Sequence, residues 1–532
     1  MSAATSLSAQ AGPDGVVRLA DLSPEERYER FDRLQARLPE VWRIIGLNEP
    51  DESVVVVPSV SLDRIGERGG TLLQAYEERF LFLLLLLRQP RLRMVYVTSV
   101  PIDPTIVEYY LALLPGVIPS HARARLALVH VGDASPRPLT DKLLERPTLL
   151  AQITRLVPDR RRSHLVPYNT TERERDLALA LGIPMYGADP RLFPLGTKTG
   201  CRRLFAEEGV QHPLGFEDLH GVEDVLGALV VLRAHRPVAV EALVKLNEGV
   251  SGEGNALVDL RGLPTPGAAG EREALAVRVR EMAFELPSTT YEAYVAKLAE
   301  RGGIVEERIV GVELRSPSVQ LRVLPGGAVE LLSTHDQVLG GPSGQSYLGC
   351  RFPADFGYAE QISRAALVVG RRLAREGVLG RFALDFVTVR DEAGQWQAYA
   401  IEINLRKGGT THPFLTLQFL TDGRYDGPTG LFRTPDGREK HLVATDHLES
   451  PDLRGLAVAD LFDVVARHRL HFDQSRQVGV VFHMISCLTE HGRVGLTAVG
   501  DTPADADARY RRAEKVLLAE AGAALAPRPL PG

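Results

Sequence analysis

The sequence predicts a multidomain protein of the α/β and α+β classes. Three observations support this prediction: four β-branched runs that alternate with helical patterns, a long mixed block rich in polar motifs, and a hairpin pattern followed by a helix at the end. We expect a disordered tail and three domains, with boundaries at 1–20, 21–190, 191–435 and 436–532. A chain of 532 residues supplies enough apolar side chains for several cores.

The first predicted domain alternates strands and helices. A helix is expected over 22–38, where Ser23 and Glu26 resemble a capping box. Helical patterns then separate four expected strands, at 53–60, 94–99, 126–131 and 163–168. Units of a strand followed by a helix predict a parallel sheet with helices on both faces. No G-x-G-x-x-G turn follows the first strand, so the sequence does not support a dinucleotide-binding site.

Composition excludes several classes of protein. Hydrophobic residues make up 44% and charged residues 24% of the chain, as in globular proteins, and a net charge of −6 indicates no nucleic-acid partner. The most apolar run, 80–87, is far shorter than the roughly 20 residues of a membrane span, so we expect a buried helix and no membrane partner. The N-terminus lacks a signal-peptide pattern. Cys201, Cys350 and Cys487 show no C-x-x-C pairing, which predicts no disulfide scaffold, no structural zinc site and a cytoplasmic protein.

Two lysines and a glycine-rich loop open a series of four motif-bearing segments in the middle domain. Lys198 lies at the start of a predicted helix, and Lys245 lies on a predicted strand. The loop after that strand contains Gly249, Ser251, Gly252 and Gly254. Glycines let backbone N–H groups approach phosphate oxygens, and lysines neutralise phosphates as point charges. Only seven of the 62 basic residues are lysines, so a lysine here carries more information than usual.

Acidic residues mark the third and fourth segments. Glu306 ends an apolar strand and Glu313 follows seven residues later, which suits an adenine amino group and a ribose diol. Glu402 and Asn404 are two apart on a strand, so their side chains leave the same face. Asp385, on the preceding strand, completes a set of oxygen ligands suited to Mg²⁺ held between phosphates. The four segments together predict ATP binding.

The ordered series, which spans residues 194–413, resembles the ATP-grasp superfamily and, within it, the carboxylate–amine ligases. The three-part layout is similar to the peptide ligases of the pheganomycin type, found in bacterial peptide natural-product pathways. The resemblance implies a pre-ATP-grasp α/β domain over 21–190, a two-subdomain ATP-grasp fold over 191–435 and a small C-terminal α+β block. Related ligases are often dimers, so a homodimer is one option, and the sequence leaves the oligomeric state open. Two features depart from the family: Ala383 stands where an arginine is common, and a Pro-containing stretch over 315–319 breaks the usual strand.

The resemblance also implies roles for individual residues. The residues implied to bind ATP are Lys198, Lys245, Gly249, Ser251, Gly252, Gly254, Glu306, Glu307, Ile309 and Glu313. The residues implied to bind Mg²⁺, or Mn²⁺ in its place, are Asp385, Glu402 and Asn404. Lys245 and Arg406 are implied to be catalytic, since Arg406 lies where related ligases place an arginine against the acyl phosphate and the tetrahedral oxyanion.

Other polar residues give weaker signals. Four are candidates for substrate contacts: Arg322, Arg381, Lys407 and His412. An arginine can hold a carboxylate by a two-pronged contact, but in so arginine-rich a chain each is as readily a surface residue. We expect residues 335–349 to form a mobile loop near the acceptor, and His483 and His491 to be structural.

The main hypothesis is an ATP-dependent carboxylate–amine ligase acting on small-molecule or peptide substrates. ATP phosphorylates a carboxylate, and an amine then attacks the acyl phosphate to form an amide or peptide bond. An ATP-grasp kinase or a carboxylate–thiol ligase is the first alternative, although the sequence shows no phosphohistidine or coenzyme A signature. A non-catalytic nucleotide-binding scaffold is the second, and the intact set of Asp385, Glu402 and Asn404 argues against it.

Overall fold

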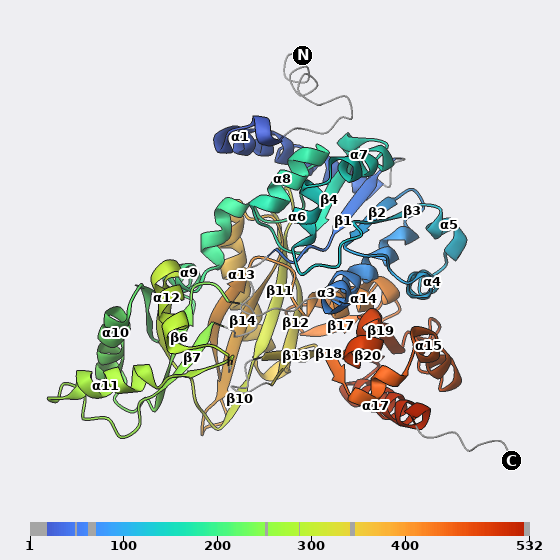
Figure 1. Cartoon of the computed structure of the whole chain (residues 1–532). Helices are drawn as coiled ribbons and strands as arrows, with labels where there is room; N and C mark the ends of the chain where they lie inside the picture. Colours follow the sequence, from blue (N-terminus) through green and yellow to red (C-terminus); the bar gives the residue numbers. More distant parts are fainter. Residues whose placement is uncertain are drawn as a thin grey trace.

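A four-stranded parallel sheet, ordered β3-β2-β1-β4, forms the centre of the N-terminal block (Figure 1). The structure, a computed structural model, describes residues 19–47, 51–61, 71–249, 254–286, 288–340 and 346–525, so the predicted tail over 1–20 lies almost entirely outside the described residues. The strands are β1 (Ser53–Val57), β2 (Arg93–Thr98), β3 (Leu126–His130) and β4 (Ser163–Pro167). Every pairing among them is parallel, which confirms the predicted sheet.

Successive side chains of each strand point to opposite faces of this sheet, and each face packs into a separate core. Val55 and Val57 face a core shared with the helices α1 (Pro24–Gln35), α6 (Leu139–Leu144), α7 (Pro147–Leu156) and α8 (Glu172–Leu181). Val54 and Val56 face a second core, which includes η3 (Arg79–Arg88), α4 (Pro104–Ala112) and the C-terminal block. Helix α1 begins at the predicted capping box, where Ser23 and Glu26 exchange side-chain and backbone hydrogen bonds.

The apolar run over 80–87 is helical and buried, as predicted, but its helix type differs from the expectation. It lies in η3, a 3₁₀ helix that directly follows α3 (Thr71–Glu78). Seven of its residues, Phe80 to Leu85 and Leu87, are among the buried core. Because the run has no polar face, its pattern could not distinguish the periods of an α-helix and a 3₁₀ helix.

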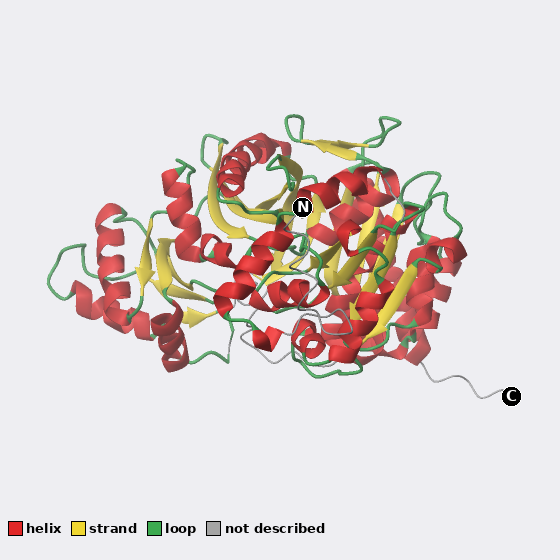
Figure 2. Cartoon of the chain, turned by 90° about the horizontal axis from the view of Figure 1, so that it is seen from above, coloured by secondary structure: helices red, strands yellow, loops and turns green. Residues whose placement is uncertain are grey.

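The middle of the chain contributes a separate five-stranded antiparallel sheet. Its order is β5-β9-β6-β7-β8, formed by β5 (Gly215–Leu219), β9 (Gly303–Glu307), β6 (Glu241–Leu246), β7 (Asn255–Asp259) and β8 (Ala283–Phe284). The helices α10 (Val222–His235), α11 (Glu271–Arg280) and α12 (Tyr291–Arg301) share its core. This sheet and its helices form the left-hand lobe in Figure 1, and from above that lobe extends from one end of an elongated molecule (Figure 2).

A nine-stranded antiparallel sheet joins the middle of the chain to its C-terminal end. Its order is β10-β14-β11-β12-β13-β18-β20-β19, with β15 also paired to β14. The strands are β10 (Glu313–Arg315), β11 (Pro317–Val323), β12 (Val329–Gly340), β13 (Ser346–Phe352), β14 (Gly380–Arg390), β15 (Trp396–Asn404), β18 (His441–Glu449), β19 (Gly479–His483) and β20 (Arg493–Gly500). Since β13 pairs with β18, the sheet continues across the predicted domain boundary near residue 435.

Helices flank the large sheet and complete the chain. Those that matter below are α9 (Lys198–Glu207), α13 (Phe356–Arg375), α14 (Thr411–Thr421), α15 (Val458–Arg467) and α17 (Pro503–Leu525). The smaller elements are η2 (Leu19–Asp21), α2 (Leu38–Leu47), α5 (Pro119–Arg123), η4 (Arg160–Arg162), η5 (Pro190–Gly196), β16 (Arg424–Asp426), β17 (Leu431–Arg433), η6 (Pro451–Gly455), η7 (Ile485–Cys487) and α16 (Leu488–His491). None of the helices in the described part of the chain has both the length and the hydropathy that a membrane crossing requires.

Three details of the sheet bear on the sequence predictions. The hairpin expected near the C-terminus is present, because β19 and β20 pair in antiparallel fashion. The Pro-containing stretch over 315–319 does interrupt a strand: β10 ends at Arg315 and β11 begins at Pro317. The expectation of a loop over 335–349 is wrong for most of that range, where paired residues of β12 and β13 flank residues 341–345, which lie outside the described residues.

A buried carboxylate ties the N-terminal block to the C-terminal block. Glu78, at the end of α3, is fully buried. Its carboxylate accepts hydrogen bonds from the backbone N–H groups of Ile485, at 2.6 Å, and Ser486, at 3.2 Å. Burial raises the pKa of Glu78 to about 7, although these hydrogen bonds act in the opposite direction.

We predict that Glu78 makes stability fall as the pH rises from about 4.5 to about 7. In that window the folded chain holds a proton on Glu78 that the unfolded chain has lost, so folding is most favourable at the acidic end. The full effect of a shift of this size is roughly 3 kcal/mol. Glu78→Gln should flatten the dependence of the urea midpoint on pH between 5 and 8, whereas Glu29→Gln, at an exposed position of α1, should not. Equal pH profiles for Glu78→Gln and the wild type would contradict the prediction.

Candidate functional site

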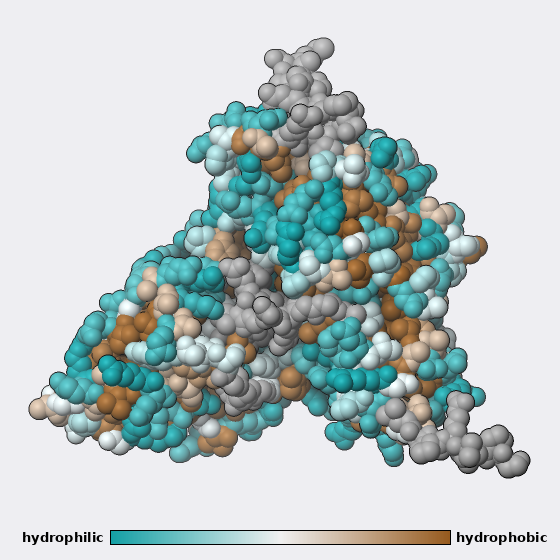
Figure 3. Space-filling model, viewed as in Figure 1, coloured by the Kyte–Doolittle hydropathy of each residue, from teal (hydrophilic) through white to brown (hydrophobic). Residues whose placement is uncertain are grey.

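A cavity of about 580 Å³ lies between the two antiparallel sheets, with the N-terminal block at one end. This volume lies in the usual range for a small-molecule site, about 300–1,000 Å³. One wall comes from β6 and β9 of the five-stranded sheet, and the opposite wall comes from β14 and β15 of the nine-stranded sheet. The space-filling view shows the three lobes in outline, with hydrophilic residues predominant on the visible face (Figure 3).

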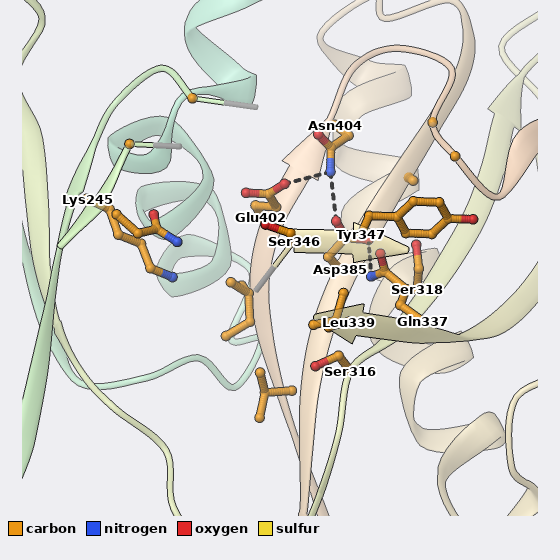
Figure 4. A pocket seen from close by; sticks show the side chains of 18 of the residues that line it. Lys245, Ser316, Ser318, Gln337, Leu339, Ser346, Tyr347, Asp385, Glu402 and Asn404 are labelled. Atoms are coloured by element: carbon orange, nitrogen blue, oxygen red, sulfur yellow. Dashed lines mark hydrogen bonds between the residues drawn. The ribbon is translucent and has the colours of Figure 1, made fainter. Parts of the chain in front are cut away.

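Two neighbouring strands bring the three predicted metal residues together. Asp385 on β14 is registered opposite Glu402 on β15, and Asn404 follows two residues later. The Asn404 amide nitrogen donates to Asp385 at 2.9 Å and to Glu402 at 2.8 Å, as the dashed lines in Figure 4 show. The amide of Gln337 donates to the second oxygen of Asp385 at 3.2 Å. Desolvation raises the pKa of Asp385, although a hydrogen bond from the Ser318 hydroxyl and nearby positive charges oppose the rise.

This set of side chains fits a magnesium ion. Two carboxylates and one amide oxygen are hard ligands of the kind that Mg²⁺ prefers, and Mg²⁺ usually completes its shell with water and phosphate oxygens. The Asn404 amide nitrogen donates to both carboxylates, and a turn of that amide would present its oxygen to an ion held between them. The same set of oxygen ligands suits Mn²⁺.

Both predicted lysines line the cavity, one on each side. Lys198, the first residue of α9, forms an ion pair with Glu402, so it lies directly beside the predicted metal residues. Burial and the charge of Lys245 lower the pKa of Lys198 to about 8. Figure 4 shows Lys245, from β6, on the wall opposite Glu402 and Asp385.

Glu306 lines the cavity and is engaged by two cations. Its side chain is 2% exposed, and its two oxygens lie 2.5 Å from the Lys245 amine and 3.2 Å from the Arg202 guanidinium. Burial on its own raises the pKa of Glu306, but the charges of Lys245 and Arg202 outweigh burial and leave the pKa lowered. Arg202 also donates to the carbonyl of Pro213 at 2.9 Å. The geometry therefore makes Glu306 the residue that positions Lys245.

Three further predicted nucleotide residues lie along the end of β9 and beyond it. Glu307 and Ile309 line the cavity. The Glu307 carboxylate accepts a hydrogen bond from the backbone of Leu214 at 2.9 Å and pairs with Arg236, so the backbone is the part of Glu307 left for a ligand. Glu313 is not among the residues that line the described cavity, although its neighbour Leu314 is. The carboxylate of Glu313 pairs with Arg315 at 2.5 Å.

The glycine-rich loop is described only at its two ends. Gly249 and Gly254 line the cavity, and a Cβ on Gly249 would lie 3.2 Å from the backbone nitrogen of Gly254. The two ends of the loop therefore approach each other closely, which favours glycine. Ser251 and Gly252 lie outside the described residues.

None of the four candidate substrate residues is among those that line the described cavity, although Lys407 lies between two that are, Arg406 and Gly408. Arg322 pairs with Glu330 at 2.5 Å, and desolvation lowers the pKa of Arg381 to about 10. Lys407 donates to the carbonyl of Pro167 at 2.5 Å, and burial lowers its pKa to about 7. His412 is buried beside His483 and Asp446, and burial lowers its pKa to about 3.

Arg406, in contrast, does line the cavity, at the end nearest the N-terminal block. Its guanidinium donates to the Tyr168 hydroxyl at 3.4 Å and to the Lys407 carbonyl at 3.3 Å. Both acceptors are neutral, so the charge of Arg406 can still be offered to an anion.

Residues that the sequence did not indicate complete this end of the cavity. They are Tyr76, Arg79, Tyr168, Asp446 and His447. Arg79 pairs with Asp446 at 2.6 Å, and its guanidinium lies over the rings of Tyr76 and Tyr168, at 5.0 and 5.9 Å from their centroids. Because these residues belong to segments far apart in the chain, no local pattern could have identified them.

The chain is similar to several known proteins. The family model described as IQCH-like, ATP-grasp matches residues 272–427, and the model described as the PGM1 C-terminal domain matches residues 460–513. The L-propargylglycine–L-glutamate ligase of Streptantibioticus cattleyicolor is 31% identical over 451 residues, which cover 83% of this chain and 89% of the ligase. IQ motif-containing protein H of Danio rerio is 26% identical over 86% of this chain, which spans 47% of that longer protein.

Two solved structures share the fold. A β-γ-ATP complex of biotin carboxylase from Campylobacter jejuni has a TM-score of 0.52 at 12% identity, covering 90% of this chain and 96% of that one. The biotin carboxylase domain of the Hydrogenobacter thermophilus 2-oxoglutarate carboxylase, with MgADP, has a TM-score of 0.51 at 14% identity, covering 87% and 89%. The ATP-grasp match and the extent of the similarity to the Streptantibioticus ligase show that the chain belongs to the ATP-grasp family of carboxylate–amine ligases, which form carbon–nitrogen bonds with ATP.

Proposed function

We propose that the protein joins the carboxylate of one amino acid or peptide to the amine of another, through an acyl phosphate formed from ATP. The observation that carries this proposal is that Lys198 and Lys245 and the cluster of Asp385, Glu402 and Asn404 line one cavity. Cationic groups for phosphates and oxygen ligands for a divalent cation are the two requirements of phosphoryl transfer from ATP. The similarity to a ligase named for two amino acids supports this class of substrates.

The five-stranded sheet is the proposed holder of the nucleotide. Leu243 and Leu246 of β6 offer apolar contacts to adenine, and the backbone of 307–309 offers hydrogen bonds to its edge. Lys245, held by Glu306, would meet the α- and β-phosphates, together with backbone N–H groups of the loop that begins at Gly249. Lys198 lies beside Glu402 and would meet the phosphate nearest the reaction.

Asp385, Glu402 and Asn404 are the proposed ligands of Mg²⁺, or of Mn²⁺ in its place. When bound, the ion supplies positive charge to the phosphate oxygens as the phosphoryl group moves. Lys198 forms an ion pair with Glu402. On binding, a phosphate would become the partner of Lys198, and the ion would become the partner of Glu402. Arg406 would hold the substrate carboxylate in line with the transferred phosphorus.

The proposed reaction has two steps. A carboxylate oxygen of the substrate forms a bond to the γ-phosphorus while the bond from that phosphorus to the β–γ bridging oxygen breaks, and ADP is released. The amine nitrogen then attacks the acyl carbon, inorganic phosphate leaves, and the nitrogen loses a proton to give the amide. Arg406 would stabilise the oxyanion that develops on the acyl oxygen. Enclosure between two sheets and the N-terminal block limits the access of water to the acyl phosphate.

The end of the cavity beside the N-terminal block is the proposed substrate site. Arg406 can take a carboxylate, and the rings of Tyr76, Tyr168 and Tyr347 offer apolar and hydrogen-bonding surface. Charged and aromatic groups in this combination suit an amino acid or a short peptide rather than a simple fatty acid. We place the reaction in the cytoplasm, where ATP is available and the three buried cysteines stay as thiols. A homodimer stays a prediction from the family.

A ligase assay tests the proposal directly. We expect ADP and phosphate release with magnesium and ATP in the presence of an acid and an amine from a panel of amino acids and short peptides. Mass spectrometry should find a product whose mass equals acid plus amine minus water. Glu402→Gln should reduce the rate by at least about 100-fold, because one carboxylate of the metal set is lost.

The control for this assay is Glu392→Gln, in the exposed turn at the far end of the β14–β15 hairpin, which should keep the wild-type rate. A phosphorylated acid without condensation would instead favour the kinase alternative. A thioester formed only with a thiol acceptor would favour the carboxylate–thiol ligase. ATP binding without turnover for every acid and amine would favour the scaffold.

The pairing of Glu306 with two cations generates a second prediction. Glu306→Gln leaves Lys245 buried without its counter-charge, whereas Arg202 keeps Glu217 at 2.6 Å, so we expect a loss of roughly 3 kcal/mol in the free energy of unfolding. Glu360→Gln breaks an exposed pair with Arg364 and should cost less than about 1 kcal/mol. Urea denaturation measures both, and a nucleotide titration should show weaker ATP binding by Glu306→Gln. Equal stability losses in the two variants would contradict the positioning role of Glu306.

A further inference from the structure

Three buried side chains from three separate elements meet behind the substrate end of the cavity. His412 lies on α14, Asp446 on β18 and His483 on β19, and each is 3% exposed. The Nε2 atoms of the two histidines are 3.0 Å apart. Oδ1 of Asp446 lies 2.8 Å from Nε2 of His483 and 3.2 Å from Nε2 of His412. These three atoms therefore form a triangle with every side at hydrogen-bond distance.

Hydrogen bonding alone cannot satisfy this triangle. If both Nε2 atoms carry protons, each can donate to Asp446, but the two donors then face one another at 3.0 Å. If either Nε2 lacks its proton, its lone pair faces the lone pairs of the Asp446 carboxylate. One side of the triangle is unfavourable in either case, and in a buried place such a contact is costly.

A divalent metal ion resolves the conflict, because all three atoms can then offer lone pairs to one centre. Ligand atoms about 2.0–2.1 Å from an ion lie about 2.8–3.0 Å apart at right angles and about 3.3–3.4 Å apart in a tetrahedral site. The separations of 2.8, 3.0 and 3.2 Å seen here lie between these limits. Two histidines and one carboxylate form a recurrent ligand set for zinc and for other transition metals. Among the described residues, one group of three His, Cys, Asp or Glu side chains has its potential ligand atoms within 4.8 Å of one another. That group is His412, Asp446 and His483.

The surroundings hold the three side chains in place. Arg79 donates to Oδ2 of Asp446 at 2.6 Å, which directs Oδ1 toward the histidines. Gly495 is registered opposite His483, and a Cβ at that position would collide with the His483 ring. Arg79 already balances the charge of Asp446, so the two imidazoles would provide most of the affinity. That favours a metal that prefers nitrogen, such as Zn²⁺, over Mg²⁺.

We propose that His412, Asp446 and His483 form a second metal site, separate from the Asp385–Glu402–Asn404 set, that takes Zn²⁺ or a similar nitrogen-preferring divalent metal. The ion connects α14 to the C-terminal strands β18 and β19. Through Asp446 it also fixes Arg79, which lines the substrate end of the cavity. Its role is to hold that wall in position, and it takes no part in the transfer of phosphate.

Metal binding by the full-length chain without an oligohistidine tag tests the proposal. After chelator treatment and desalting, we expect Co²⁺ to bind at one equivalent per chain, with visible d–d absorption, and Zn²⁺ to displace it while Mg²⁺ does not. His483→Gln should weaken Co²⁺ binding by more than about tenfold. The control His468→Gln, a partly exposed histidine of the same block that pairs with Glu520, should bind as the wild type does.

A second measurement keeps the test informative if His483→Gln folds poorly. Zn²⁺ should raise the thermal midpoint of the chelator-treated wild type, because it binds the folded state, and should leave that of His412→Gln unchanged. No stoichiometric Co²⁺ or Zn²⁺ binding by the wild type would overturn the proposal, and so would equal Co²⁺ binding by wild type and His483→Gln. Equal ligase activity with and without bound zinc would show that the ion has no role in holding that wall of the cavity.

Discussion

Buried positive charges that need partners shape the cavity between the two sheets. Lys245 is held by Glu306 within the five-stranded sheet, and Lys198 pairs with Glu402 on the nine-stranded sheet. A buried charge without a partner is unstable, so each lysine fixes a carboxylate and each carboxylate fixes a lysine. The pair of Lys198 and Glu402 joins a proposed phosphate ligand to a proposed metal ligand. A bound phosphate would take the place of Glu402 beside Lys198, and a bound ion would take the place of Lys198 beside Glu402. The binding of the nucleotide and the binding of the ion would therefore be coupled.

The C-terminal block contributes to the cavity because it shares a sheet with the middle of the chain. Strand β18 pairs with β13, and its residues Asp446 and His447 line the cavity. The N-terminal block reaches the same place through Arg79 and Tyr168. The proposed substrate site is therefore built by three blocks, whereas the proposed nucleotide site is built by the middle block alone. A change in the N-terminal or C-terminal block would therefore alter the proposed substrate site without altering the proposed nucleotide site.

The parts of the site that the sequence predicted are those encoded by local spacing. Glu402 and Asn404 share a face because they are two apart on one strand, and a short turn brings Asp385 beside them. The parallel sheet was predictable for the same reason, since each strand and its helix are neighbours in the chain. Arg202 was missed, although it lies four residues after Lys198 on α9 and so on the same face of the helix. Its ion pair with Glu306 therefore involves a residue that the sequence indicated only as a nucleotide contact.

The substrate end was not predictable, because its contacts join distant segments. Arg79 and Asp446 are separated by 367 residues, and His412 and His483 by 71. The cysteine spacing predicted no structural zinc site, but cysteine spacing can indicate only sites whose ligands include cysteine. Ligands that come from a helix and two strands leave no spacing pattern, and they meet only because the large sheet continues into the C-terminal block. A ligase of this design shows its use of ATP in short motifs and its choice of substrate only in the folded chain.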